Sequence, residues 1–327
     1  MSTSDAEFSS WLWAAAGTFT TTIAGLAFET IPFLLMGTLL SAFIQVFVPD
    51  RALRKIFPRN HLASIGVALV IGAIVPICEC GTVPLARRLR RKGLPLSTAT
   101  AFLLAAPLVN PMTIASTYVA FQGTGYRLYA YRLVVGLVCA FALALLVEWA
   151  SRLNPSIDLA EDPGLIRFSP AAMPRPPRLI RRHPPRRGLG ARFAEALDHA
   201  TFDFFDSCRF LVLGISVAAL ARACVPLGAL VKSLGSPVPA ASTGAAAAYV
   251  LSLCSSADAF VARSLFAPAS YEAALSFLIL GPMIDIKNTI LLSRFVRPKH
   301  LAPFLAAIFA VVVATALASA PIMEALR

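Results

Sequence analysis

Long uncharged apolar segments constrain this chain more than any other feature of its sequence. Residues 301–320 contain no charged side chain, and residues 131–147 are interrupted only by Arg132. Each segment approaches the ~20 apolar residues that a helix needs to cross a bilayer. Only 14% of the 327 residues are charged, whereas a soluble protein has roughly 25%. We therefore expect an all-α polytopic membrane protein.

The charges and cysteines indicate what this membrane protein binds. The net charge of +12 comes from loops between apolar segments, where topology and anionic lipid account for it. The six cysteines lie mostly in apolar segments, so no disulfide framework is expected. The first ten residues contain no Lys or Arg, and no secretory signal is predicted. We expect membrane lipid and a small molecule as partners, without nucleic acid, cofactor or metal, and the oligomeric state is left open.

A stretch rich in arginine and proline divides the chain. Residues 151–192 hold nine arginines and eight prolines, a composition that keeps a segment extended or disordered. We predict a first membrane repeat over 1–150, a cytoplasmic linker over 151–192 and a second membrane repeat over 193–327. Motifs recur at a shift of 175–177 residues: FLLMG at 33–37 with FLVLG at 210–214, Cys78 with Cys254, Pro107 with Pro282, and Asn110 with Asp285. Such internal repeats are common in secondary transporters.

Eight apolar segments leave two topologies open. If all eight cross the membrane, the basic loops 51–59 and 87–92 lie on opposite sides. If 61–81 and 240–258 instead enter and return as hairpins, the basic loops gather on one side, which the positive-inside rule favours. Three crossings per half would then make the second half an inverted copy of the first. Ahead of its first span, an amphipathic helix over 193–206 is expected to lie in the membrane interface.

Four breaks interrupt the apolar segments: ICECGT at 77–82, APLVNP at 106–111, CSSAD at 254–258 and GPMID at 281–285. Broken backbone at membrane depth is tolerated where it is buried in protein or lines a wet cavity. Paired breaks at corresponding places in two halves indicate a binding site near the membrane midplane. We therefore expect a binding or translocation site that includes Cys78, Glu79, Cys80, Pro107, Asn110, Cys254, Ser255, Asp258 and Asp285.

The presence of three acids at breaks within apolar segments needs a physical explanation. A carboxylate at the centre of a membrane helix costs roughly 2.5–3.5 kcal/mol on insertion scales. We interpret Glu79, Asp258 and Asp285 as binding or proton-coupling groups for this reason. Lys287 lies two residues beyond Asp285 and can simply neutralise it.

The thiols of Cys78 and Cys80 are one residue apart on an irregular backbone and can turn toward one soft centre. Soft ligands of this kind select thiophilic species. A trivalent arsenical with one carbon group has two exchangeable positions, which suits two sulfurs. Simple packing of two small residues is the alternative. A membrane thiol-disulfide oxidoreductase is another, although such enzymes usually carry CxxC at a helix N-terminus.

Four motifs carry a resemblance to a known family: PICECGTVPLARRLRRKG, AFLLAAPLVNPMTIASTYVAF, LSLCSSADAFVARS and FLILGPMIDIKNTILL. Over roughly residues 30–300 the chain resembles the bacterial predicted-permease family that includes YraQ and the organoarsenical efflux permease ArsP. The resemblance implies a multi-pass permease of the bacterial cell inner membrane, not an enzyme. It places functional weight on the predicted site residues except Ser255, and only some members are tied to arsenicals.

These observations together predict a permease that exports a small solute by alternating access. The solute would be a trivalent organoarsenical or another thiophilic species, as in arsenic resistance, with a proton gradient as the candidate driving force. A thiol-disulfide oxidoreductase using Cys78 and Cys80, or a passive channel, are the alternatives. The chain contains no GxxxxGK[ST] motif, so ATP use within this chain is not expected.

Overall fold

The computed structural model describes residues 3–47, 56–58, 60–75, 77, 79–122, 126–153, 189–224, 235–255, 257–266, 270–293, 296 and 298–325. All regular structure in these ranges is helical, which confirms the expected class. The helices are α1 (Thr3–Phe47), α3 (His61–Ile74), α4 (Glu79–Arg91), α5 (Leu96–Leu108), α6 (Pro111–Ala120), α7 (Tyr126–Leu153), α8 (Leu189–Cys224), α10 (Pro237–Leu251), α11 (Asp258–Leu265), α12 (Tyr271–Met283), α13 (Ile286–Leu292) and α14 (Pro298–Ala325).

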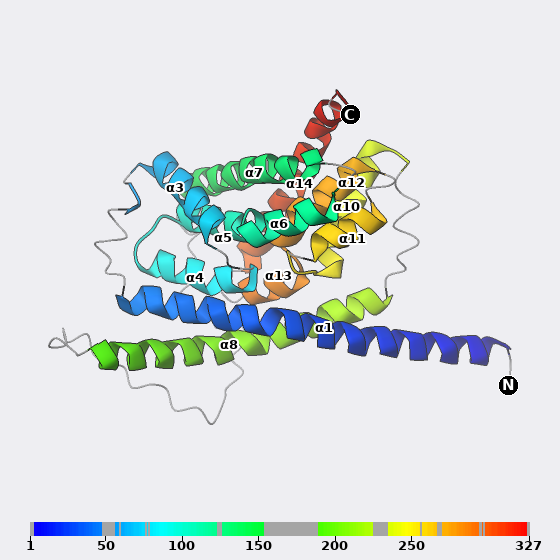
Figure 1. Ribbon diagram of the computed structural model, residues 1–327, viewed down its shortest axis with the longest axis horizontal. Coiled ribbons are helices and arrows are strands. Elements are labelled where there is room, and N and C mark those ends of the chain that lie inside the picture. Colours follow the sequence, from blue (N-terminus) through cyan, green and yellow to red (C-terminus); the bar gives the residue numbers. More distant parts are fainter. Residues whose placement is uncertain are drawn as a thin grey trace.

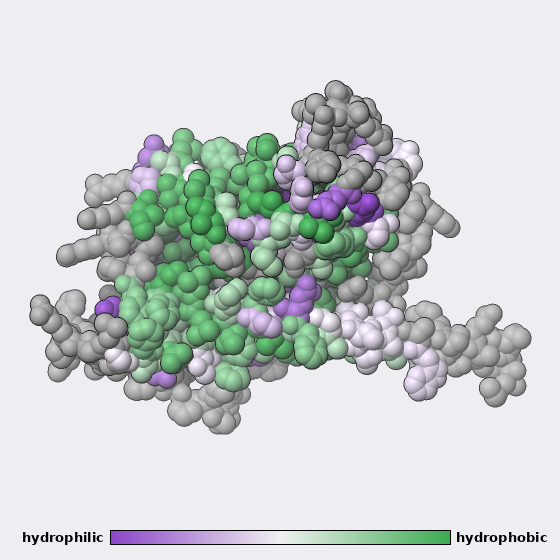
Figure 2. Space-filling model, viewed as in Figure 1, coloured by the Kyte–Doolittle hydropathy of each residue, from purple (hydrophilic) through white to green (hydrophobic). Residues whose placement is uncertain are grey.

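Six helical segments are long and apolar enough to cross a membrane: Ala16–Ile44, Leu96–Ala120, Leu128–Leu153, Arg192–Ala221, Tyr271–Leu292 and Lys299–Ser319. Helices α3 and α10 have 14 and 15 residues. At ~1.5 Å per residue they are shorter than the ~30 Å hydrocarbon core. Six membrane spans are therefore the number expected if residues 61–81 and 240–258 do not cross the membrane. Hydrophobic side chains cover much of the surface in Figure 2, as a lipid-facing protein requires.

The two longest helices, α1 and α8, pack along each other in opposite directions (Figure 1). The ring of Phe193 near the start of α8 lies 5.3 Å from those of Phe43 and Phe47 at the end of α1. Helix α8 continues without interruption past residue 206, so the boundary expected after a separate interfacial helix over 193–206 is wrong. Residues 191–213 contain neither proline nor glycine, and nothing stops the helical hydrogen-bond ladder there.

The core lies around α5 and α12. In the candidate spans Leu96–Ala120 and Tyr271–Leu292, 72% and 83% of the apolar stretch is buried inside the protein. Helix α3 packs on α5 and α10 packs on α12, while α7 and α14 flank them. Helices α4 and α13 lie between the α1–α8 pair and the other helices (Figure 1). The two short helices are thus enclosed on both sides.

Both central segments break and restart where the sequence predicts. The side chain of Asn110 caps α6 by accepting a hydrogen bond from the Thr113 backbone N–H at 2.8 Å. The side chain of Asp285 caps α13 in the same way, from the Asn288 N–H at 2.6 Å. Each cap satisfies a backbone donor that a helix start leaves free. The breaks after α5 and after α12 therefore share one local structure.

Candidate functional site

Two contacts between short helices bring the predicted site residues together. We call the contact of α4 with α13 the first crossing, and the contact of α11 with α6 the second crossing. Each joins a helix that begins with an acidic residue, Glu79 or Asp258, to a helix that restarts after a break. Each therefore places helix ends and a carboxylate in the protein interior.

The first crossing holds two of the predicted acids on one lysine. The Lys287 Nζ lies 3.2 Å from Asp285 Oδ2 and 3.7 Å from Glu79 Oε1, and all three side chains are almost completely buried. Buried charges are tolerated when they are paired. The interpretation of Lys287 as the neutralising partner of Asp285 is confirmed. The ammonium also joins α13 to Glu79 on α4, which the sequence analysis did not foresee.

Two predicted thiols lie at the same crossing. Cys80 and Cys254 are buried and belong to no disulfide, and both lie within electrostatic range of Lys287. Cys80 belongs to a small apolar cluster with residues of α1 and α8. Ser255 is buried beside Cys254. Cys78 lies outside the described residues, so the joint action of its thiol with that of Cys80 stays a prediction.

Helices α1 and α8 cover the first crossing through close glycine contacts. A Cβ atom at Gly37 of α1 would lie 2.5 Å from Gly81 Cα of α4, and one at Gly214 of α8 would lie 2.9 Å from Lys287 Cα. Only glycine permits such an approach of two backbones. These glycines end the FLLMG and FLVLG motifs. An ion pair between Arg88 of α4 and Asp203 of α8 adds to the cover.

A small cavity, about the size of one water molecule, opens at the first crossing. Its polar lining comes from Glu79 and Thr82 of α4 and from Asn288 of α13, and Met283 and Ile284 line it at the end of α12. The Asn288 side chain is 4% exposed. Its Oδ1 atom is buried and has no hydrogen-bond partner among the described residues. One residue that lines the cavity therefore carries an acceptor that no described donor satisfies.

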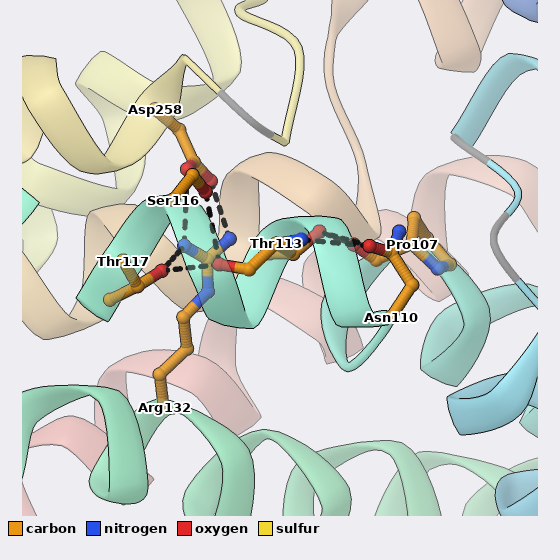
Figure 3. Close-up of polar contacts among 7 residues, drawn as sticks. All are labelled: Pro107, Asn110, Thr113, Ser116, Thr117, Arg132 and Asp258. Atoms are coloured by element: carbon orange, nitrogen blue, oxygen red, sulfur yellow. Dashed lines mark hydrogen bonds and ion pairs between the residues drawn. The ribbon is translucent and has the colours of Figure 1, made fainter. Parts of the chain in front are cut away.

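The second crossing is closed by a bidentate ion pair (Figure 3). The Arg132 guanidinium, from α7, donates to both carboxylate oxygens of Asp258, at 3.1 and 2.7 Å. It also donates to the Thr117 hydroxyl of α6 at 2.6 Å. Arg132 and Asp258 are 2% and 1% exposed. This bidentate geometry is the strong form of a charged hydrogen bond.

Asn110 links the break after α5 to the segment before α4. Its Oδ1 accepts hydrogen bonds from the backbone and the hydroxyl of Thr113, and its Nδ2 donates to the Ile77 carbonyl at 3.4 Å. The Thr113 hydroxyl also donates to the Pro107 carbonyl at 3.2 Å. Figure 3 shows Asn110 and Thr113 at the start of α6, the helix that carries Thr117 beside Arg132. Pro107 and Asn110 thus shape the break that leads to the second crossing.

The predicted site residues are therefore divided between two places. Glu79, Cys80, Cys254 and Asp285 belong to the first crossing, and Asp258 belongs to the second. Pro107, near the end of α5, and Asn110, the cap of α6, form the break that leads to the second crossing. Sequence reasoning missed the roles of Arg132 and Thr117. The available signal was that Arg132 is the only charge in the run 131–147, which marks it as a residue that needs a buried partner.

Comparison with known proteins adds the family context. A family model described as a predicted permease, ArsP_1, matches residues 15–320. UPF0718 protein YcgR of Bacillus subtilis (strain 168) is 31% identical over 264 residues, which cover 81% of this chain and 84% of that protein. A Streptococcus mutans protein named "Putative two-component membrane permease complex subunit" is 32% identical over 276 residues, 84% of this chain and 86% of that protein. UPF0718 protein YraQ of Escherichia coli (strain K12) is 28% identical over 137 residues, 39% and 38% of the two chains. No solved structure matches the chain.

Proposed function

This chain belongs to the predicted permease family ArsP_1, and we propose that it exports a small thiophilic solute across the bacterial inner membrane through the first crossing. One observation carries the proposal. The first crossing gathers Glu79, Asp285 and Lys287 with the thiols of Cys80 and Cys254 inside a bundle of six candidate spans. Secondary transporters place their substrate sites at such broken helices, between two halves of the chain. The family supports a transporter rather than an enzyme.

The thiols define the substrate class. Cysteine sulfur is a soft ligand and selects soft partners. A trivalent organoarsenical with one carbon group exchanges two positions, so it can bond to two sulfurs at once. Cys80 and Cys254 both lie within electrostatic range of Lys287, and Cys78 adjoins this place in the sequence. Trivalent organoarsenicals are therefore the first substrates to test.

We also propose that residues 1–150 and 193–327 are inverted repeats joined by the linker 151–192. The antiparallel packing of α1 and α8 supports this, because these helices carry the related motifs FLLMG and FLVLG. The equivalent contacts of α3 with α5 and of α10 with α12 support it as well. If the two halves exchanged their conformations, α11 and α6 would take the arrangement of α4 and α13, so the second crossing would take the form of the first. The Arg132–Asp258 pair would then be the closed gate on the side opposite the first crossing.

The test uses everted membrane vesicles from cells that produce the full chain. We expect saturable accumulation of a trivalent aryl arsenical, and its loss in Cys80→Ser. Ser319→Ala should retain the wild-type rate, because this buried hydroxyl bonds only within α14. Vesicles that contain folded protein but accumulate no arsenical, or a Cys80→Ser variant with the wild-type rate, would contradict the proposal.

Accumulation that persists without a pH gradient would remove the proton as driving ion. Passive flux without saturation would favour a channel, and thiol oxidation during turnover would favour an oxidoreductase.

A second candidate is that the permease works as one subunit of a complex. The Streptococcus mutans relative is named as a subunit of a two-component membrane permease complex. If this chain acts in the same way, gentle solubilisation of native membranes should recover it with one other membrane protein in constant ratio. Recovery of the chain alone, with transport intact after reconstitution, would contradict this candidate.

A further inference from the structure

We propose that Arg263 of α11 is a second fastening of the gate at the second crossing, and that it releases α6 before the Arg132–Asp258 pair opens. This rests on the proposed permease function, in which the second crossing is the closed gate. Asp258 begins α11, and Arg263 lies in its last turn. The short helix is therefore fastened at both of its ends.

The Arg263 guanidinium binds the C-terminal end of α6. Its Nη1 donates hydrogen bonds to the backbone carbonyls of Ala120 and Gln122, the latter at 3.1 Å. The last carbonyls of a helix lack partners within the helix, and a cation there also meets the negative end of the helix dipole. Arg263 thus supplies donors to a helix end that belongs to the other half of the chain.

Both fastenings of α11 cross from the second half of the chain to the first. Asp258 accepts hydrogen bonds from Arg132 of α7, and Arg263 donates to α6. Apolar packing instead holds α11 within its own half. Phe266, at the end of α11, is 1% exposed, and its ring lies 5.4 Å from that of Phe277 in α12. Helix α11 can therefore separate from α6 while it stays on α12.

The middle of α11 contributes little to the hold. Its buried side chains between the two ends are the methyl groups of Ala259 and Ala262, and Phe260 is exposed. One methyl group makes few dispersion contacts. The attachment of α11 to the first half therefore depends mainly on the polar groups at its ends.

The two fastenings differ in what their release costs. Arg263 is only partly buried and its partners are neutral carbonyls, so water can replace both sides of the contact. The Arg132–Asp258 pair is almost completely buried, and its separation leaves two charges without partners. Arg263 is therefore the contact that releases first.

The corresponding arginine of the first crossing makes a stronger contact. Arg88, in the second half of α4, is 7% exposed and forms an ion pair with Asp203 of α8. This contact also joins the two halves of the chain, but a carboxylate holds a guanidinium more strongly than a carbonyl does. Of the two arginines, Arg263 is the one suited to reversible release.

Arg263 lies on the membrane side opposite the linker 151–192. Helix α7 is a candidate span that begins at Tyr126, soon after Gln122, and ends at Leu153, inside the linker. Since the linker is predicted to be cytoplasmic, a reagent outside the cell would reach the Arg263 end of the second crossing.

The experiment measures how fast a membrane-impermeant maleimide labels Cys254 when it is added to spheroplasts that contain the full chain, without any arsenical. Cys254 is 2% exposed, and its carbonyl accepts hydrogen bonds from the N–H groups of Ala257 and Asp258 at the start of α11. Its labelling therefore reports movement of α11. Mass spectrometry of peptides distinguishes Cys254 from Cys80 at the first crossing.

We expect Arg263→Gln to speed the labelling of Cys254 by about three- to tenfold and to leave the rate at Cys80 unchanged. Arg263→Lys should stay near the wild-type rate, because an ammonium can donate to the same carbonyls. Arg209→Gln is the matched control, since the ion pair of Arg209 with Asp206 lies within α8, and it should label as the wild type does.

Two outcomes would overturn the proposal. One is a wild-type rate at Cys254 in Arg263→Gln. The other is an equal rise at Cys254 and Cys80, which would show general loosening rather than release of a gate. If Arg263→Gln does not fold, Arg263→Ala replaces it, because alanine has the highest helix propensity, and the same two outcomes apply. No arsenical is present, so failure here leaves the export proposal standing, whereas absent arsenical accumulation with selective labelling of Cys254 would contradict only export.

Discussion

The first and second crossings use similar helix ends for different electrostatic arrangements. At the second, one guanidinium and one carboxylate satisfy each other in a bidentate pair. At the first, one ammonium lies between two carboxylates at 3.2 and 3.7 Å, beside a cavity and two thiols. A complete pair holds two helices together, whereas a shared ammonium leaves polar atoms that a ligand can contact. This contrast is why we propose the substrate site at the first crossing and the closed gate at the second.

The covering helices differ as well. Helix α1 packs on α4 and α8 packs on α13, so the first crossing lies beneath both long helices. The second crossing has α7 at its side, which supplies Arg132. Glycine contacts at Gly37 and Gly214 hold the cover close to the first crossing.

The largest effect is expected from Lys287→Met. The change removes the only ammonium that the structure places between Glu79 and Asp285, and leaves two carboxylates buried. Breaking a buried ion pair costs about 3–5 kcal/mol, so we expect little folded protein after detergent extraction. Size-exclusion chromatography and thermal melting measure the loss. Lys299→Met is the control, because Lys299 is exposed. A Lys287→Met protein with the wild-type melting temperature would show that the two acids do not depend on this lysine.

The next largest loss of stability is expected from Asp258→Asn, which tests the second crossing. Asparagine keeps one acceptor for Arg132 but removes the negative charge, so we expect a loss of about 2–3 kcal/mol in the free energy of unfolding. The double variant Arg132→Gln and Asp258→Asn should cost less than the sum of the single changes, because the two residues act as a unit. Strict additivity in thermal melting would contradict the pairing.

A smaller effect is expected from Gly37→Ala, which perturbs the cover of the first crossing only. The new methyl group would lie 2.5 Å from Gly81 Cα, and overpacking of this kind costs about 1–3 kcal/mol. Gly25→Ala on the same helix is the matched control, because nothing lies within 4 Å of its Cβ position. Alanine there should raise helix stability by about 0.5–1 kcal/mol. Equal melting temperatures for the two variants would mean that α1 does not pack tightly on α4.

Much of this architecture could be predicted from local sequence. The apolar runs indicate the spans, and proline with a following cap residue marks where α5 and α12 stop. These are local effects of backbone hydrogen bonding, so they can be recognised within a few residues. Local sequence is misleading at residue 206, because the amphipathic pattern over 193–206 predicts a separate interfacial helix, whereas the backbone continues without interruption as α8.

The partners of the buried charges could not be predicted in the same way. Arg132 pairs with Asp258, 126 residues away, and Lys287 reaches Glu79 in the other half of the chain. Helical periodicity gives the face on which a residue lies but not the helix that meets this face. Burial of a charge demands a partner, and each of the three acids has one, while their role in binding or proton coupling stays a prediction. Which partner each acid takes depends on tertiary packing.

The smallest effect, expected from Thr117→Val, tests how completely the Arg132–Asp258 pair closes the second crossing. The Thr117 hydroxyl accepts a hydrogen bond from Arg132 at 2.6 Å and donates one to the Thr113 carbonyl. Valine keeps the shape of the side chain but removes both bonds. The carboxylate still satisfies the guanidinium, so we expect a loss of only about 0.5–1.5 kcal/mol. Ser116→Ala is the neighbouring control, since its hydroxyl bonds only within α6, and it should change the melting temperature less.

If Thr117→Val costs as much as Asp258→Asn, the guanidinium depends on the hydroxyl as strongly as on the carboxylate. The second crossing would then be a network held by α6, and its contrast with the first crossing would rest on the thiols and the cavity alone.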